Sequence, residues 1–262
     1  MTDAILQAGH LRKEFGGLVA VAEVTLNVQR GSIHSIIGPN GAGKTTLFNL
    51  LSGKYKPTSG QVTFNGKDIT PLPPFKRAQM GMGRSYQITN IFPNLTVLEN
   101  VRLAAQRDSN VWRNVLRLKE AFRDHYDEAH EILEIVHLGK DVDTVANSLP
   151  HGGKRKLELA ILLATKPELL LLDEPTAGMA SEQVPELIGV IDDIRKQGNR
   201  TVVLVEHNMN VVMGISDRIT VMNYGSVIAE GTPTQISSNE TVQSVYLGGL
   251  YESLDEAGAA HD

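Results

Sequence analysis

A nine-residue loop between an apolar run and a helix start constrains this chain more than any other feature. Residues 38–46 read GPNGAGKTT, which matches the pattern G-x-x-x-x-G-K-[ST] of a phosphate-binding loop. Gly38, Gly41 and Gly43 let the backbone turn its N–H groups toward phosphate oxygens, because side chains there would obstruct that path. A glycine-rich turn that matches by chance is the alternative, and the residues on either side of the loop argue against it.

Those flanking residues predict a strand, a loop and a helix in that order. The run Ile33–Ile37 is apolar apart from one His, and Thr46–Leu51 can begin a helix whose positive N-terminal end would face the phosphates. In this arrangement Lys44 contacts the β- and γ-phosphates, and the Thr45 hydroxyl ligates magnesium. The sequence therefore predicts a site for a nucleotide with Mg²⁺.

Composition narrows the class of protein. The chain has 262 residues, which suits one large α/β domain or a core with an added subdomain, and it contains no cysteine, so disulfides and thiolate metal sites are excluded. We find neither a signal peptide at the start nor an apolar run near the ~18 residues that a membrane-spanning helix needs. The net charge of -5 argues against nucleic acid as the main partner, which usually selects a basic face.

The pattern along the chain changes from strand to helix and back. Alternation in Leu18–Val28 and a short run at 59–66 that ends in Asn-Gly predict an early β-rich part. From about 96 to 148 the spacing is helical, beginning at Thr96 with Glu99 three residues later, as in a capping box. One face of this helical region is marked by apolar and aromatic residues: Val115, Leu118, Phe122, Tyr126, Ala129, Leu133 and Val136. Buried strands are expected again at 169–172 and 202–205.

A second pair of functional residues ends one of these later strands. Four leucines, 169–172, lead directly into Asp173 and Glu174. The end of a buried strand is where a parallel sheet presents catalytic groups. We expect Asp173 to hold magnesium and Glu174 to polarise a water for attack on the γ-phosphate. A pair of helix-capping carboxylates is the alternative, and the phosphate loop earlier in the chain makes it the weaker one.

With these two motifs and four more, the chain resembles the ATPase subunits of ABC transporters from about residue 5 to 250. Gln87 precedes ITNIFPNLTVLENV, which is similar to the family's Q-loop segment, and LPHGGKRKLELA stands where the family has its LSGGQ signature. His207 follows a strand, as the family's switch histidine does, and Phe15 occupies the position of the aromatic residue that stacks on adenine.

The resemblance implies a role for each matching residue. Catalysis would involve Glu174, His207, Gln87 and Lys44, and Mg²⁺ would be held by Thr45, Gln87 and Asp173. The residues implied to bind ATP are Phe15, Gly38, Pro39, Asn40, Gly41, Ala42, Gly43, Lys44, Thr45, Thr46, His151, Gly152 and Gly153. Because the signature completes the nucleotide site of the opposite subunit, two subunits are expected to meet head to tail.

The signature departs from the family pattern. Pro150 replaces Ser, His151 replaces the first Gly, and Gly153 replaces Gln, while Ala180 lies near the position that usually holds Asp. Proline can donate no hydrogen bond to phosphate from either its side chain or its nitrogen. We therefore expect weaker ATP-driven closure at the site that this signature completes, with Gly152 and the helix start providing the remaining contacts.

The expected fold is an α/β, P-loop ABC ATPase core with an N-terminal antiparallel β subdomain. A single domain would span 1–250, with a helical subdomain inserted at about 88–160 and a loosely ordered tail at 251–262. The segments KEFGGLVAV, NIFPNLTVLENV, DEPTAGM and VQSVYLGG are most similar to ATPase subunits of importers for branched-chain amino acids and related amides. A lipopolysaccharide-export ATPase shares several of them and remains an alternative.

The resemblance also implies partners and a location. We expect integral membrane permeases, a second ATPase subunit as homodimer or heterodimer, and a substrate-binding protein, with the chain held at the cytoplasmic face of the inner membrane. A soluble ABC protein that acts on nucleic acid or ribosomes is the rival from another class, but such proteins usually carry two cassettes or a long coiled-coil insertion. A non-hydrolysing scaffold and a P-loop kinase or GTPase are weaker alternatives.

Overall fold

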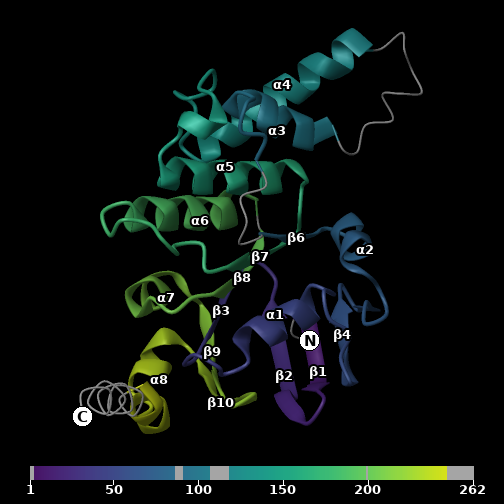
Figure 1. Ribbon diagram of the computed structural model, residues 1–262, viewed down its shortest axis with the longest axis vertical. Coiled ribbons are helices and arrows are strands. Elements are labelled where there is room, and N and C mark those ends of the chain that lie inside the picture. The colour runs from purple at the N-terminus through teal and green to yellow at the C-terminus, as the bar shows by residue number, and fades with distance from the viewer. Residues whose placement is uncertain (1–2, 86–90, 107–117, 199, 247–262) are drawn as a thin grey trace, which may run out of the picture. The chain divides into compact units, whose positions relative to one another are not determined.

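The computed structural model describes residues 3–85, 91–106, 118–198 and 200–246 (Figure 1). The chain divides into two compact units. The first unit contains residues 1–77 and 201–262, and the second contains residues 78–200. The tail predicted at 251–262 and Gln87 lie outside the described residues.

The first unit begins with an antiparallel sheet. Strands β1 (Ala4–Phe15), β2 (Leu18–Gln29), β4 (Ser59–Phe64) and β5 (Lys67–Asp68) are paired in the order β2-β1-β4-β5. Over residues 24–28 of β2, Val24, Leu26 and Val28 are buried and the residues between them are exposed, as a period-two pattern requires. Asn65 and Gly66 form the turn between β4 and β5, both with positive φ. The predicted N-terminal antiparallel sheet is confirmed.

A second group of strands in the same unit carries the phosphate loop. Strand β3 (Ile33–Ile37) pairs in parallel with β8 (Thr201–Val205) and with β9 (Arg218–Asn223), and β10 (Ser226–Gly231) runs antiparallel to β9. Every residue of β3 and β8 is buried, as expected for strands of a parallel sheet. Parallel pairing places the carboxyl ends of β3 and β8 at the same edge.

Among the residues that the structure describes, three helices belong wholly to the first unit. They are α1 (Lys44–Leu51), α7 (Met209–Ile215) and α8 (Pro233–Ser237), and α2 (Pro74–Gln79) spans the boundary between the units. Helix α8 begins with a complete capping box between Thr232 and Gln235. A core cluster beside it joins strand and helix residues: Ile37, Val212, Ile219, Val221, Ile236 and Val242.

The second unit is mostly helical. Strands β6 (Met82–Arg84) and β7 (Leu169–Asp173) pair in parallel. The helices are α3 (Val97–Ala105), α4 (Leu118–Ile135), the 3₁₀ turn η4 (Ala146–Ser148), α5 (His151–Ala164) and α6 (Val184–Gly198). Buried Ala129, Leu133 and Val136 continue the apolar face that the sequence predicted for this region.

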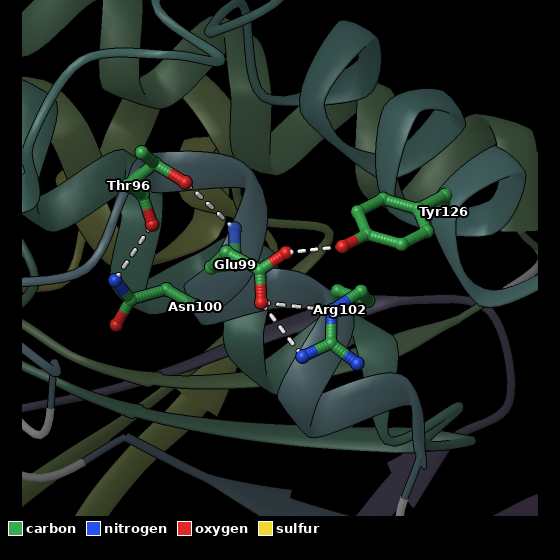
Figure 2. Close-up of polar contacts among 5 residues, drawn as sticks. All are labelled: Thr96, Glu99, Asn100, Arg102 and Tyr126. Carbon is green, nitrogen blue, oxygen red and sulfur yellow. Dashed lines mark hydrogen bonds and ion pairs between the residues drawn. The ribbon is translucent and has the colours of Figure 1, made fainter. Parts of the chain in front are cut away.

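Helix α3 starts at the predicted cap, but the capping residues are used differently (Figure 2). The Thr96 hydroxyl accepts a hydrogen bond from the Glu99 N–H at 3.2 Å. The Glu99 carboxylate instead accepts hydrogen bonds from Arg102 and from the Tyr126 hydroxyl of α4, the latter at 2.5 Å. Glu99 therefore joins two helices rather than only closing the helix start.

The expected α/β fold with antiparallel strands, parallel strands and helices is confirmed. The helical subdomain predicted at about 88–160 stays a prediction; α3, α4 and most of α5 fall inside those limits, and α5 continues to Ala164. Within the part of the chain that the structure describes, no helix has the length and apolar character needed to cross a membrane.

Candidate functional site

The phosphate loop has a backbone that only glycine permits at two of its positions. Gly38 and Gly43 have φ of 152° and 97°. A Cβ at Gly38 would lie 2.2 Å from the Met222 carbonyl oxygen, and one at Gly43 would lie 2.4 Å from that of Ala20. The loop is therefore pressed between β9 and β2, and a side chain at either glycine would displace it.

A backbone hydrogen bond holds the same loop against the turn between β9 and β10, and a second one holds that turn against β2. The Gly225 N–H donates to the Ala42 carbonyl at 3.0 Å, and the Ala22 N–H donates to the Gly225 carbonyl at 2.8 Å. Tyr246, from the carboxyl-terminal end of the described chain, packs against the cluster that contains Ile37. Burial raises the pKa of Tyr246 to about 12, an effect that the nearby Gly38 backbone opposes.

Lys44 points back across the loop. Its ammonium group donates to the carbonyl oxygens of Gly38 and Pro39 at 2.7 and 2.9 Å, and the residue is only 8% exposed. Lys44 also begins helix α1, whose first turn contains no acidic residue. A buried cation at a helix N-terminus, beside N–H groups freed by glycines, fits the phosphates of a nucleotide.

The other loop residues expected to bind nucleotide lie around this cation. Asn40 and Gly41 are exposed, Ala42 is buried, and Thr45 and Thr46 occupy the first turn of α1 with Thr45 exposed. The Thr45 hydroxyl is thus available as an oxygen ligand, which is the donor type that Mg²⁺ prefers.

His207 lies at the same sheet edge as the phosphate loop. Val205, two residues before it, is the register partner of Ile36, two residues before Gly38. The carboxylate of Glu206 is fully buried and accepts the backbone N–H groups of His207 and Asn208 at 3.1 and 3.3 Å. Glu206 therefore fixes the backbone that carries His207, a role that the motif Val205-Glu206-His207 could have indicated.

Phe15 ends β1 as a half-exposed aromatic ring. It is 43% exposed, its ring meets the Tyr55 ring edge-on at 5.5 Å between centroids, and the Lys13 ammonium lies 4.9 Å from its centroid. The hairpin that contains Phe15 also supplies Ala20, which abuts Gly43 of the phosphate loop. An exposed ring on that hairpin fits a base-stacking role.

In the second unit, Asp173 and Glu174 leave the end of β7. Asp173 is 8% exposed, and its N–H donates to the Ser85 hydroxyl at 3.1 Å. The Arg84 guanidinium lies 3.8 Å from the Asp173 carboxylate. Glu174 has a left-handed φ of 47°, which is uncommon for glutamate and marks a sharp turn at this position. Sequence reasoning did not identify Ser85 or Arg84 in this site.

The signature residues form the first turn of α5. Pro150 is the N-cap and makes no side-chain capping hydrogen bond, His151 is exposed, and Gly152 and Gly153 are buried. His151 Nε2 lies 3.3 Å from the Ala177 carbonyl oxygen in the loop after Glu174. Asp173, Glu174 and the signature therefore belong to one structural group.

The predicted site residues thus fall into two groups, each described within its own unit. Phe15, residues 38–46 and His207 belong to the first unit, and His151–Gly153, Asp173 and Glu174 belong to the second. Over the described residues, no group of three or more His, Asp or Glu is arranged to hold a metal ion.

A glycine-rich loop between a buried parallel strand and a helix, together with carboxylates at the end of another buried strand, defines a P-loop ATPase. The family model for ABC transporters matches residues 21–177, and the model described as a branched-chain amino acid ATP-binding cassette transporter matches residues 226–251. This chain belongs to the ABC transporter family, and its ATP hydrolysis is coupled to transport.

Curated relatives cover almost the whole chain. The branched-chain amino acid transport ATP-binding protein LivG of Escherichia coli strain K12 is 40% identical over 95% of this chain and 99% of its own length. BraF of Pseudomonas aeruginosa, also named as a branched-chain amino acid transport ATP-binding protein, is 42% identical over 95% of this chain and 99% of its own length. The lipopolysaccharide export ATP-binding protein LptB of Haemophilus influenzae is 34% identical over 94% of this chain and 98% of its own length.

Solved structures of ABC transporter cassettes also match this chain. The structure of the cassette MJ1267 in its ADP conformation matches this chain with a TM-score of 0.80 and 29% sequence identity. The match covers 94% of this chain and 99% of the MJ1267 chain. The dimeric structure of the cassette MJ0796 bound to ADP and phosphate matches with a TM-score of 0.71 and 26% sequence identity. The match covers 87% of this chain and 98% of the MJ0796 chain. Cassettes of this family bind nucleotide, work as dimers with membrane permeases and are peripheral to the membrane.

Proposed function

We propose that this chain energises the uptake of branched-chain amino acids or of related hydrophobic amino acids and amides. The observation that carries this proposal is the match of residues 226–251 to the branched-chain amino acid cassette model. The names of the relatives at 40 and 42% identity support the same substrate class. The permeases and a substrate-binding protein select the transported molecule, because this subunit binds nucleotide.

Nucleotide binding is assigned to the first unit. The loop residues from Gly38 to Thr46 cradle the phosphates of ATP with backbone N–H groups, and Lys44 supplies a cation at that place. The buried position of Lys44 and its two carbonyl partners support this role. Phe15 provides the face on which adenine stacks, and its 43% exposure supports that assignment.

Hydrolysis is assigned to residues of both units. Glu174 orients and polarises the attacking water, and His207 stabilises that arrangement beside the γ-phosphate. When bound, Mg²⁺ neutralises phosphate charge, with Thr45, Asp173 and Gln87 as its protein ligands. The Ser85 and Arg84 contacts to Asp173 support a carboxylate held in one position.

The working assembly in this proposal contains two ATPase subunits. His151, Gly152 and Gly153 of one subunit complete the nucleotide site of the other, either as a homodimer or with a sister ATPase. Permeases anchor the pair at the cytoplasmic face of the inner membrane, and a substrate-binding protein delivers the substrate. The family-wide dimeric arrangement supports the first part of this assembly.

Lipopolysaccharide export is the second candidate, because one relative with that name covers nearly the full chain at 34% identity. The identity is lower than for the importer subunits. The two functions differ in their partners: an importer requires polytopic permeases and a soluble binding protein, whereas the export system would supply different membrane proteins.

The test is affinity purification of the tagged full chain from detergent-solubilised membranes of its own cells. We expect mass spectrometry to identify polytopic permeases, and radiolabelled leucine uptake to fall when the chromosomal copy carries Glu174→Gln. The matched control is Glu182→Gln, an exposed glutamate in the same loop region, which should leave uptake unchanged. Recovery from the soluble fraction alone, with ribosomal or nucleic-acid partners, would overturn the transporter assignment.

A further inference from the structure

The signature turn and the loop after Glu174 are joined by a side chain that departs from the family pattern. His151 Nε2 lies 3.3 Å from the Ala177 carbonyl oxygen. Because a carbonyl oxygen only accepts, Nε2 carries the proton in this contact. A Cβ at Gly178 would lie 3.3 Å from the same nitrogen, so the imidazole packs closely against the backbone of the loop.

The next signature residue packs against the same loop. A Cβ at Gly152 would lie 3.1 Å from the Gln183 side-chain oxygen and 3.4 Å from the Met179 methyl carbon. Gly152 is buried, so there is little room for this side of α5 to move independently of the loop. Two consecutive signature residues therefore lie close against the segment that follows Glu174.

Ala177 connects this contact to Glu174. The Ala177 N–H donates to the Glu174 carbonyl at 3.1 Å, while the Ala177 carbonyl receives the His151 contact. The next turn of the loop is closed by the Met179 N–H, which donates to the Thr176 carbonyl at 3.1 Å. Ala177 is therefore hydrogen-bonded both to the α5 N-terminus and to the Glu174 backbone.

The far end of the loop is also attached to α5. Lys156, one turn after the signature, forms an ion pair with Glu186 in the first turn of α6. A small cavity lies between α5 and the carboxyl-terminal end of β7, and the residues that line it include Arg155, Glu158, Ser85 and Asp173. The loop from Glu174 to Gln183 is therefore held by α5 near both of its ends.

We propose that His151 is a positioning residue for Glu174. The hydrogen bond from His151 to Ala177 holds the loop in the conformation that aims the Glu174 carboxylate, and it does so in a chain where Ala180 stands near the position usually occupied by Asp. Through His151, contact of the signature with a partner subunit's nucleotide also sets the geometry of Glu174 in its own subunit. This inference rests on the proposed role of Glu174 in hydrolysis.

The experiment compares His151→Leu with His151→Gln in the full transporter complex purified from membranes. We expect Leu to lower kcat about tenfold, the effect of losing one positioning hydrogen bond. Binding of ATP to the isolated full chain should change by less than about twofold, because His151 is assigned to the partner subunit's nucleotide and not to its own. Gln should restore most of kcat, because its side-chain N–H can replace Nε2–H. His130→Leu, an exposed histidine of α4, is the matched control and should match the wild type.

A double mutant separates positioning of Glu174 from general damage to the loop. If His151 acts through Glu174, adding His151→Leu to Glu174→Gln should change the residual hydrolysis rate by less than about twofold. An additional loss of about tenfold in that background, or a failure of Gln to rescue, would contradict the proposal.

The two levels of the proposal fail in different ways. If the complex with Glu174→Gln hydrolyses ATP as the wild type does, the assigned role of Glu174 is wrong. If Glu174→Gln abolishes hydrolysis while His151→Leu retains the wild-type kcat, only the inference about His151 is wrong.

Discussion

Arg77 shows how a single buried cation can fix the end of the helix that begins with the phosphate loop. Arg77 is 1% exposed, and its guanidinium donates to the carbonyl oxygens of Leu50, Leu51, Leu72 and Thr70 at 2.7–3.2 Å. Leu50 and Leu51 are the last residues of α1, whose final carbonyls lack partners within the helix. Burial lowers the pKa of Arg77 to about 10, partly offset by Asp68, so the group stays charged at neutral pH.

We predict that both Arg77→Lys and Arg77→Leu lower the free energy of unfolding of the full chain by about 3 kcal/mol or more. Lysine cannot donate hydrogen bonds to all four carbonyl oxygens, because its ammonium group lacks the planar set of donors that guanidinium has. Leucine removes the donor altogether. Chemical denaturation measures the change, and Lys76→Gln at the exposed neighbouring position should stay within about 0.5 kcal/mol. An Arg77→Leu protein as stable as the wild type would contradict this account.

His34 makes stability depend on pH. It is fully buried on β3, and its Nε2 contacts the Thr220 hydroxyl at 2.8 Å. Burial, together with the charge of Arg218, lowers its pKa from 6.5 to about 4. Between these values the unfolded chain binds the proton and the folded chain does not, so stability falls as the pH falls from 6.5 toward 4, by up to about 3 kcal/mol.

His34→Gln should therefore flatten the loss of stability between pH 7 and pH 4.5, because glutamine does not titrate. The measurement is the unfolding midpoint at several pH values in that range, with His130→Gln at an exposed position as the control. A variant that loses stability with acid as steeply as the wild type would rule out His34 as the source.

Sequence reasoning worked best where function imposes a local pattern. The spacing of Gly38, Gly43 and Lys44 predicted a strand, loop and helix that the structure contains. It missed Arg77 and Ser85. The α1 carbonyls that Arg77 binds, those of Leu51 and Leu50, lie 26 and 27 residues away in the chain, and Asp173, the partner of Ser85, lies 88 residues away. No local pattern marks a contact between residues so distant in the chain.

At the scale of elements, one carboxylate links α3 to α4. Hydrogen bonds from Arg102 and from Tyr126 lower the pKa of Glu99, and the Glu99 contact raises the pKa of Tyr126 (Figure 2). Arg102 also lies over the Tyr126 ring at 5.3 Å. The sequence predicted the Thr96 cap and the helical face that includes Tyr126, but the choice of Arg102 and Tyr126 as partners of Glu99 depends on how the two helices pack.

We predict that Tyr126→Phe weakens this helix pair, since it removes a charge-assisted hydrogen bond to Glu99 at a partly exposed position. Hydrogen exchange of the α3 and α4 amides at neutral pH measures the loss. Because the pKa of Glu99 is lowered on folding, its stabilising contribution is present above its ordinary value of 4.5 and is lost as the pH falls through the lowered value. The difference between Tyr126→Phe and wild type should therefore shrink in acid, and a difference that persists would contradict the role of Glu99.

At the scale of the whole molecule, each chain carries the phosphate loop in one unit and Glu174 with the signature in the other. The family assignment follows from local motifs, because each is tied to nucleotide chemistry. The transported substrate is harder to predict from sequence, since no residue of a nucleotide-binding subunit has to contact it. Residues 226–251 match the branched-chain amino acid cassette model, and this match points to the subfamily and not to nucleotide chemistry.

This division of roles predicts how the full chain should assemble with ATP. Glu174→Gln keeps the shape of the side chain but removes the base, so ATP should bind and the closed dimer should persist instead of reopening after hydrolysis. Size-exclusion chromatography with light scattering should then show a dimer only when ATP is present. Adding Lys44→Ala to the same chain should return it to a monomer, because the phosphates lose their buried cation, whereas Glu182→Gln alone should not trap a dimer. A Glu174→Gln chain that stays monomeric with saturating ATP would contradict this prediction. Closure would then require the permeases, a sister ATPase or the signature serine that Pro150 replaces. Adding Pro150→Ser to Glu174→Gln tests the last of these, because a dimer should then form if the missing serine is responsible.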